Sequence, residues 1–176
     1  MTAGVHRFAV GLGANLGDAA ATLIDAVARL AAADGVRLTA VSSPYRTAPV
    51  GGVPQDDFLN AVVVGETTLP PLELLRLCRA IEDAHHRTRD VRWGPRTLDL
   101  DVLVHGDVVS TDPGLTLPHP RAHERAFVLV PWLEADAEAR LPGRGRVADL
   151  LATVGTGGVR RVRIDGWPEP AGRADG

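Results

Sequence analysis

The chain has 176 residues, a formal net charge of -3 at pH 7 and 45% hydrophobic residues, a composition typical of one globular domain with its own core. All nineteen basic residues are arginine, which excludes a Walker A phosphate loop, a Schiff-base lysine and a protein-kinase active site, because each requires a lysine. The single cysteine excludes an internal disulfide and a Cys-x-x-Cys motif. Without a signal peptide or a long apolar run, a cytoplasmic protein with no membrane association is expected.

Strands and helices are predicted in a regular order along the chain. Apolar periodicity predicts a strand over residues 6–12, a helix over 19–33, strands over 36–45 and 58–67, a helix from 70 to 86, a strand over 97–104, and helices over 124–135 and 147–154. Strand 97–104 is expected to form a hairpin with Val108 and Val109. His85 and His86 are expected to be surface groups at the end of their helix.

The order strand, helix, strand, strand, helix, strand favours a ferredoxin-like α+β sandwich. In that fold one mostly antiparallel sheet carries helices on one face, and the later segments would be additional C-terminal elements. Neither a repeat nor a domain boundary is evident, so residues 1–165 are expected to form a single domain. Residues 166–176, rich in Gly and Pro, are expected to be a disordered tail.

Two acidic residues follow a group of arginines. Asp99 and Asp101 are two residues apart in a predicted strand, so both point to one face. The preceding loop carries Arg87, Arg89, Arg92 and Arg96. The ordinary explanation is a solvated strand face beside a surface loop. Arginines and carboxylates that share Mg²⁺ with phosphates are, however, the recurring combination for phosphoryl transfer, and so dense a group of arginines in a net acidic chain favours it.

Two further motifs favour ordinary roles. The glycines between Gly11 and Gly17 are spaced one residue too widely for a dinucleotide-binding fingerprint, which favours a tight strand-to-helix turn. His119 and His123 are four residues apart, but the prolines on both sides of His119 disfavour a shared helix face and a zinc site. A phosphate contact by His119 remains open.

An aromatic and an amide side chain share a face of the third strand. Phe58 and Asn60 are two residues apart, which suits a flat heterocycle with donor and acceptor edges. Core packing is the competing explanation for Phe58 and for Phe127, and spacing alone favours it.

Taken together, five segments resemble the family of 6-hydroxymethyl-7,8-dihydropterin pyrophosphokinases of folate biosynthesis. They are GLGANLGD (11–18), SSPYRTAPVG (42–51), DFLNAVV (57–63), RWGPRTLDLDVL (92–103) and LPHPRAHERAFVLVP (117–131). The resemblance covers residues 8–151 and implies the ferredoxin-like fold. It also implies transfer of a diphosphoryl group from ATP to the hydroxymethyl oxygen of the pterin, with release of AMP.

The resemblance implies a role for each matching residue. Asp99 and Asp101 would hold two Mg²⁺ ions, and together with Arg87 and Arg96 they are the expected catalytic residues. ATP contacts are implied for Arg87, Arg89, Trp93, Arg96, Thr116, His119 and Arg125. Pterin contacts are implied for Thr47, Pro49, Val50, Gly51, Phe58, Asn60 and Phe127. Glu82 matches a position near the active site without a specified role.

Three positions depart from the family pattern, at Phe58 (often Tyr), near Gly114 (often basic) and at Pro120. The aspartate pair and the loop arginines are intact, so we expect an active enzyme that works as a monomer on small molecules, without a nucleic-acid partner. Two alternatives stay open. A ferredoxin-like sheet can bind RNA, although paired aromatics are missing from the central strands, and the domain could bind its ligands without turnover.

Overall fold

The computed structural model describes residues 4–14, 18–47, 57–86 and 98–168. The helices are α1 (Ala19–Ala32), α2 (Pro71–His86), the short 3-10 helix η1 (Ala122–Glu124), α3 (Ala126–Ala135) and α4 (Val147–Val154). The strands are β1 (His6–Ala14), β2 (Val36–Val41), β3 (Tyr45–Thr47), β4 (Phe58–Thr67), β5 (Asp99–His105), β6 (Ser110–Asp112), β7 (Leu115–Leu117), β8 (Arg140–Leu141), β9 (Gly145–Arg146) and β10 (Val159–Arg161). None of the helices in these ranges is long and apolar enough to cross a bilayer.

One antiparallel sheet organises the molecule. Its strands follow the order β10-β3-β4-β1-β5, and β2 also pairs with β4. The long central pair β1 and β4 runs in register from His6 opposite Thr67 to Ala14 opposite Leu59. The order β2-β4-β1-β5 with α1 and α2 as connections is that of a ferredoxin-like fold, so the predicted α+β class is confirmed.

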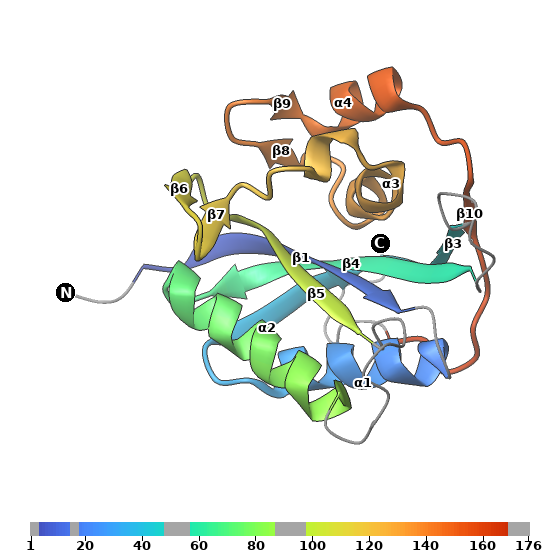
Figure 1. Ribbon diagram of the computed structural model, residues 1–176, viewed down its shortest axis with the longest axis horizontal. Helices are drawn as coiled ribbons and strands as arrows, with labels where there is room; N and C mark the ends of the chain where they lie inside the picture. Colours follow the sequence, from blue (N-terminus) through green and yellow to red (C-terminus); the bar gives the residue numbers. More distant parts are fainter. Residues whose placement is uncertain (1–3, 15–17, 48–56, 87–97, 169–176) are drawn as a thin grey trace.

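Helices cover both faces of this sheet, whereas one covered face was expected. Figure 1 shows α1 and α2 below the sheet and α3 and α4 above it. The lower core contains Leu23 and Leu30 of α1 packed with Phe8 and Val10 of β1. The upper core contains Leu129 and Trp132 of α3 together with strand residues of the opposite face, among them Ala9, Val62 and Val64. The extra C-terminal segments therefore form a third layer.

Two predicted strand arrangements are wrong in detail. The predicted strand 36–45 is two strands, β2 and β3, separated by residues 42–44. Pro44 in this interruption has no N–H to donate to a ladder. The predicted hairpin of strand 97–104 with Val108 and Val109 does not form. A turn at Gly106, with φ +55°, redirects the chain, and the next strand, β6, pairs with β7 instead of β5.

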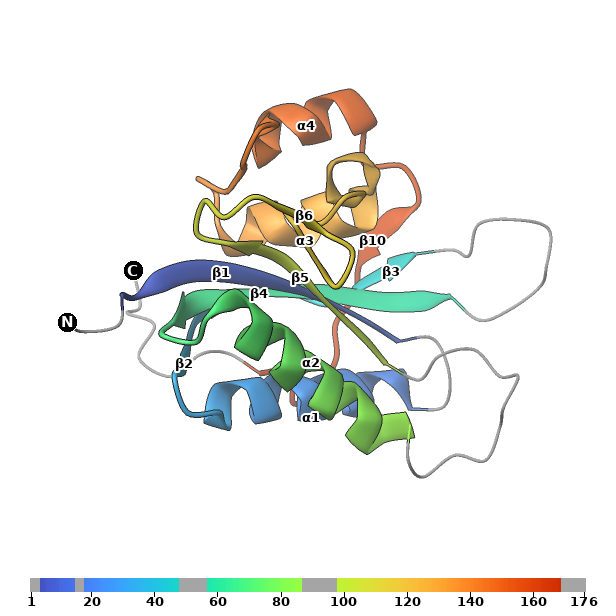
Figure 2. The same ribbon diagram turned by 60° about the vertical axis from the view of Figure 1, so that its left-hand side comes forward.

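The C-terminal segment crosses from the upper layer to the lower one. β10 pairs with β3, with Val159 opposite Thr47, and the chain then continues past the sheet edge toward α1 (Figure 2). Trp167 packs against the lower core, and its indole N–H donates to the backbone oxygen of Ser42 at 2.7 Å. Trp167 therefore belongs to the folded domain, although it falls in the predicted tail. Residues 169–176 lie outside the described ranges.

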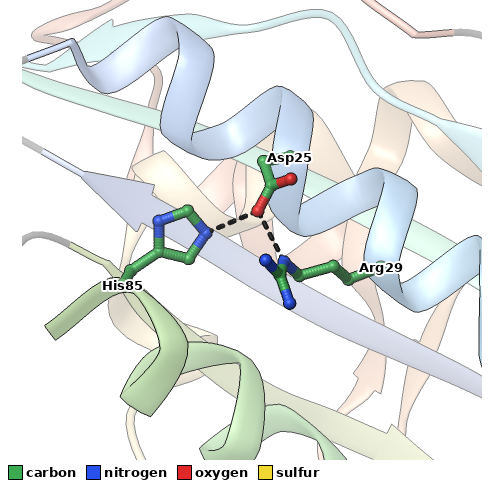
Figure 3. A network of polar contacts seen from close by, with 3 residues as sticks. All are labelled: Asp25, Arg29 and His85. Carbon is green, nitrogen blue, oxygen red and sulfur yellow. Dashed lines mark hydrogen bonds and ion pairs between the residues drawn. The ribbon is translucent and has the colours of Figure 1, made fainter. Parts of the chain in front are cut away.

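A small polar network joins α1 to the end of α2 (Figure 3). One carboxylate oxygen of Asp25 accepts from Arg29 Nε at 2.6 Å and lies 2.8 Å from His85 Nε2. The His85 side chain is only 17% exposed. His85 therefore connects two helices, whereas the sequence predicted a surface group. The hydrogen bond from Arg29, with further help from His85, holds the pKa of Asp25 below its usual value.

This network predicts a pH-dependent loss of stability in Asp25→Asn. Because the folded-state pKa of Asp25 is lowered, its contribution is present above pH 4 and is lost as the pH falls through that lowered pKa. The carboxylate is 44% exposed, so solvent screening limits the expected effect to about 0.5 kcal/mol at pH 7. Urea unfolding at pH 7 and pH 2.5 measures it, with Asp34→Asn as the control. The prediction would be contradicted if the unfolding free energies of Asp25→Asn and the original protein differed by the same amount at both pH values.

Candidate functional site

Within the part of the chain that the structure describes, the upper face of the sheet is covered by α3 at one end and uncovered at the other. Side chains alternate between faces along each strand, so residues two apart along β1 share the upper face. Near the start of β1 this face carries Ala9, which is buried under α3. Farther along β1 the same face carries Gly11 and Gly13, opposite Asp101 and Asp99 of β5. Because glycine has no side chain, β1 leaves the space beside the two carboxylates free of side-chain atoms.

A cavity of about 1040 Å³ occupies this open end. Its floor is formed by the upper-face residues of β1, β4 and β5, and its walls by the segment 121–128 and by the segment between α4 and β10. Its lining includes Thr47, Phe58, Asn60, Asp99, Asp101, Arg121, Glu124, Arg125, Phe127, Gly155, Gly157 and Val159. This volume slightly exceeds the usual range of about 300–1,000 Å³ for small-molecule cavities, so it can hold more than one small ligand.

Gly13 is required by the side chain of its neighbour in the sheet. Gly13 lies opposite Asn60, and a Cβ atom at Gly13 would be 2.9 Å from Asn60 Nδ2. That distance is shorter than real Cβ contacts. The glycine therefore allows the amide of Asn60 to lie over the sheet, and this role explains part of the glycine motif that the sequence assigned to a turn.

Asp99 and Asp101 lie on the cavity floor at the edge of the sheet. Asp99 is half-buried and Asp101 is exposed. Between them, the N–H of Leu100 donates to Glu82 Oε2 of α2 at 2.8 Å. This bond satisfies a backbone donor of the edge strand, so Glu82 fixes the short stretch of β5 that presents both carboxylates. This contact gives Glu82 a structural role beside the site, where the sequence had indicated none.

His119 lies beside this pair and is held by backbone contacts. Its N–H donates to the oxygen of Leu103 at 2.9 Å, and its Nδ1 accepts from the N–H of Arg121 at 3.2 Å. The ring proton of neutral His119 is therefore on Nε2, which lies 3.9 Å from Asp101 Oδ2. Burial lowers the pKa of His119, against the opposing effect of Asp101, so the ring is neutral at pH 7.

The other end of the cavity combines aromatic surface with unsatisfied polar atoms. Asn60 Oδ1 and Thr47 Oγ1 are buried and have no hydrogen-bond partner in the described part of the chain. Phe58 and Phe127 line the cavity with them, and the guanidinium of Arg125 lies 5.6 Å from the centre of the Phe127 ring. Buried polar atoms without partners are costly, so this end is suited to a flat ligand with polar edges.

The donor set at Asp99 and Asp101 fits Mg²⁺. Both donors are hard carboxylate oxygens, and the described ranges contain no group of three or more His, Cys, Asp or Glu side chains that could hold a metal ion. An all-protein cage for Zn²⁺ or Ca²⁺ is thus not formed by these residues. Mg²⁺ commonly takes only one or two carboxylates and completes its shell with water and substrate phosphates.

The structure gathers seven of the predicted site residues in the cavity. They are Thr47, Phe58, Asn60, Asp99, Asp101, Arg125 and Phe127. His119 lines an adjacent hollow of about 310 Å³. Thr116 lines neither, and its hydroxyl donates to the oxygen of Asp112. The predicted residues Pro49, Val50, Gly51, Arg87, Arg89, Trp93 and Arg96 lie outside the described ranges.

Several lining residues were not among the predicted site residues, and two of them are charged. Arg121 and Glu124 line the cavity, and both stand in the quoted segment 117–131, where charge alone could have indicated Arg121. The segment from Val154 to Val159 forms a further wall. Its small residues carry no chemical signal in the sequence.

Known proteins with related sequences share one name. Residues 9–137 match the model of the 7,8-dihydro-6-hydroxymethylpterin-pyrophosphokinase family. The chain is 46% identical over 156 residues to a 2-amino-4-hydroxy-6-hydroxymethyldihydropteridine pyrophosphokinase of Methylorubrum extorquens, covering 89% of this chain and 98% of the relative. The enzyme of the same name from Pseudomonas aeruginosa is 40% identical over 161 residues, covering 90% of this chain and 98% of the relative.

Solved structures support the fold. A Plasmodium falciparum HPPK-DHPS A437G crystal structure with SDX-DHP superposes with a TM-score of 0.71 at 13% identity. The match covers 96% of this chain and 51% of the Plasmodium chain. At this identity the likeness concerns the fold, and it agrees with the ferredoxin-like order of the central strands.

Proposed function

Since the chain belongs to the 7,8-dihydro-6-hydroxymethylpterin-pyrophosphokinase family, we propose that its cavity transfers a diphosphoryl group from ATP to the hydroxymethyl oxygen of 6-hydroxymethyl-7,8-dihydropterin. In this reaction of folate biosynthesis, the pterin oxygen forms a bond to the β-phosphorus. The bond between that phosphorus and the bridging oxygen of the α-phosphate breaks, AMP leaves, and the hydroxyl proton is released. The observation that carries the proposal is one cavity with a carboxylate pair at one end and an aromatic, amide-lined pocket at the other.

The pterin is proposed to bind at the Asn60 end. Asn60 and Thr47 offer polar atoms that lack partners in the described chain, and a pterin edge alternates donors and acceptors that can satisfy them. Phe127 offers its ring for stacking. Phe58 offers a second aromatic surface at this end. The backbone over residues 49–51, with Pro49, Val50 and Gly51, is proposed to complete the pterin contacts.

The triphosphate is proposed to bind at the carboxylate end. Asp99 and Asp101 would hold Mg²⁺, which supplies charge neutralisation for the phosphate oxygens when bound. Glu82 keeps both carboxylates in place through the N–H of Leu100, and Arg125 adds a cation on the facing wall. Neutral His119 can donate from Nε2 without adding charge. Thr116 is proposed as a further contact on the nucleotide.

The remaining positive charge is proposed to come from the arginine-rich loop. With no lysine in the chain, Arg87 and Arg96 are the proposed phosphate clamps, and Arg89 and Trp93 the proposed contacts of a loop beside ATP. Arginine suits this role because its planar donors engage two phosphate oxygens together. Because the cavity of one chain contains both proposed ends, a monomer is the proposed working form. A cytoplasmic location and the lack of a nucleic-acid partner are proposed with it.

The reaction is tested by product analysis. Purified protein is incubated with Mg²⁺, ATP and the hydroxymethyl dihydropterin, and the nucleotides are separated by chromatography while phosphorus NMR identifies the pterin product. AMP and a pterin diphosphate are expected in equal amounts. Formation of ADP with a pterin monophosphate would contradict diphosphoryl transfer, and binding of both substrates without turnover would leave only a ligand-binding domain.

Asn60→Ala is expected to weaken pterin binding selectively. The substitution removes the amide from the pterin edge, and loss of hydrogen bonds worth about 1.5–3 kcal/mol corresponds to a roughly 10- to 100-fold higher KM for the pterin. The KM for ATP should stay near its original value. Thr39→Ala is the control, because Thr39 also bonds to β4, through the oxygen of Val64, but is outside the cavity lining. An equal rise in both KM values would contradict a pterin-specific role.

A further inference from the structure

We propose that Arg121 is an additional binding residue for the polyphosphate and that Glu124 is its resident counter-ion, which the phosphates displace. The inference rests on the proposed function, because it assigns a new residue to the triphosphate end of the same cavity. Arg121 follows the predicted nucleotide contact His119 by two residues and precedes Arg125 by four. It was not among the site residues that the sequence indicated.

Arg121 is placed at the cavity by the chain around it. Both Arg121 and Glu124 line the cavity that contains Asp99 and Asp101. The backbone N–H of Arg121 donates to His119 Nδ1 at 3.2 Å, and His119 Nε2 lies 3.9 Å from Asp101 Oδ2. A short run of contacts therefore connects the Arg121 backbone to the proposed metal-binding carboxylate.

The side chain of Arg121 is held where an anion can replace its partner. Arg121 Nε donates to Glu124 Oε1 at 3.0 Å across η1, and the two side chains are 65% and 49% exposed. Such exposed pairs are readily screened by solvent and add little to stability. A phosphate group is a stronger partner, because it carries more charge and can accept two guanidinium N–H bonds. Exchange of the carboxylate for phosphate is thus favourable.

Arg125, the other arginine of this segment proposed to lie near the triphosphate, has a different partner. Its guanidinium lies over Phe127 at 5.6 Å from the ring centre, at the wall proposed to stack on the pterin. Arg121 is instead joined through His119 to the Asp101 side. The two arginines of the segment are therefore held by different partners, Arg125 beside Phe127 and Arg121 beside Glu124.

Competition between Glu124 and phosphate predicts effects of opposite sign for the two partners. Arg121→Gln is expected to weaken binding of Mg²⁺ with the α,β-methylene analogue of ATP by about 10-fold. Glu124→Gln removes the competing carboxylate, so binding is expected to be about 2- to 3-fold tighter. Arg121→Lys keeps the charge without the paired donors and is expected to lie between Arg121→Gln and the original protein. Isothermal titration calorimetry measures each dissociation constant.

The chain offers a closely matched control pair in Arg76 and Glu73 of α2. Arg76 Nη1 lies 3.2 Å from Glu73 Oε1, with side-chain exposures of 65% and 52%, nearly those of the cavity pair. Arg76→Gln and Glu73→Gln change the net charge equally but away from the cavity lining. Both are expected to leave the dissociation constant of the analogue unchanged.

The outcomes separate this inference from the proposed function. AMP production by the unaltered protein tests the function alone. If the unaltered protein makes AMP, and Arg121→Gln binds the analogue with the same dissociation constant as the unaltered protein, the inference is overturned and the function stands. The inference is also overturned if Glu124→Gln binds the analogue more weakly than the unaltered protein. It is overturned likewise if Arg76→Gln weakens binding of the analogue as much as Arg121→Gln does. Opposite shifts confined to the cavity pair support it, even if the unaltered protein binds the analogue without forming AMP.

Discussion

Asp101→Asn is expected to reduce diphosphoryl transfer by about two to four orders of magnitude while leaving the fold intact. Asparagine has nearly the same shape but lacks the negative charge that the proposed Mg²⁺ site requires. Charge stabilisation by a metal is worth several kcal/mol, and each 1.36 kcal/mol is tenfold in rate. Asp99→Asn should have an effect of similar size, because both carboxylates stand on one strand face. Steady-state rates of AMP formation measure both.

The dependence on metal concentration identifies the cause of this loss. For either variant, half-maximal activity should require more Mg²⁺ than the original protein needs. Asp107→Asn is the matched control, since Asp107 is an exposed aspartate in the turn that follows β5 and does not line the cavity. A variant with near-normal rates at the original Mg²⁺ concentration would refute the metal role of its aspartate. An unchanged thermal midpoint would show that the fold is kept.

Gly65→Ala is expected to be the most destabilising small substitution in the sheet. Gly65 lies in the central strand β4, between Phe8 of β1 and Leu38 of β2. A Cβ atom there would lie 2.2 Å from the backbone oxygen of Arg37 and 3.0 Å from Phe8 Cε1. Since the nearest atom is backbone, the strand itself must move. Overpacking costs about 1–3 kcal/mol where side chains can adjust, so we expect about 3 kcal/mol or more.

Urea unfolding measures this loss, and Gly11→Ala is its control. A Cβ atom at Gly11 would be 3.6 Å from Leu103 Cδ2, an ordinary contact. Its unfolding midpoint should therefore stay close to that of the original protein. A Gly65→Ala midpoint equal to that of Gly11→Ala would show that β2 moves aside without cost. The irregular register between Leu38 and Ala40 is then where the movement should occur.

Local patterns were sufficient to predict the central elements. The apolar, Val-rich run of β4 and the apolar stripe of α1 predicted elements within one residue of those observed, because each depends on neighbours in the chain. The third layer was not predicted. Whether α3 packs on the other face of the sheet depends on a core that gathers residues distant in sequence, such as Trp132 and Val62.

The site residues likewise divide into those that local spacing indicates and those that depend on contacts between distant elements. Asp99, Asp101, Phe58 and Asn60 could be indicated from two-residue spacing, and the resemblance added Phe127 on a different element. The functions of Glu82 and His85 could not be predicted, since each depends on one hydrogen bond to a residue on another element. A helical surface position looks the same in sequence whether or not such a partner lies opposite.

The wall between α4 and β10 has a consequence for the order in which the molecule is made. β1 is near the start of the chain, but the facing wall and the partner of β3 come from Val154 to Arg161. During synthesis on the ribosome, the cavity cannot be completed until the chain from β1 to β10 has been made. A nascent chain that has reached only α3 therefore has an incomplete cavity, and if the pterin binds there as proposed, its binding would report the arrival of β10.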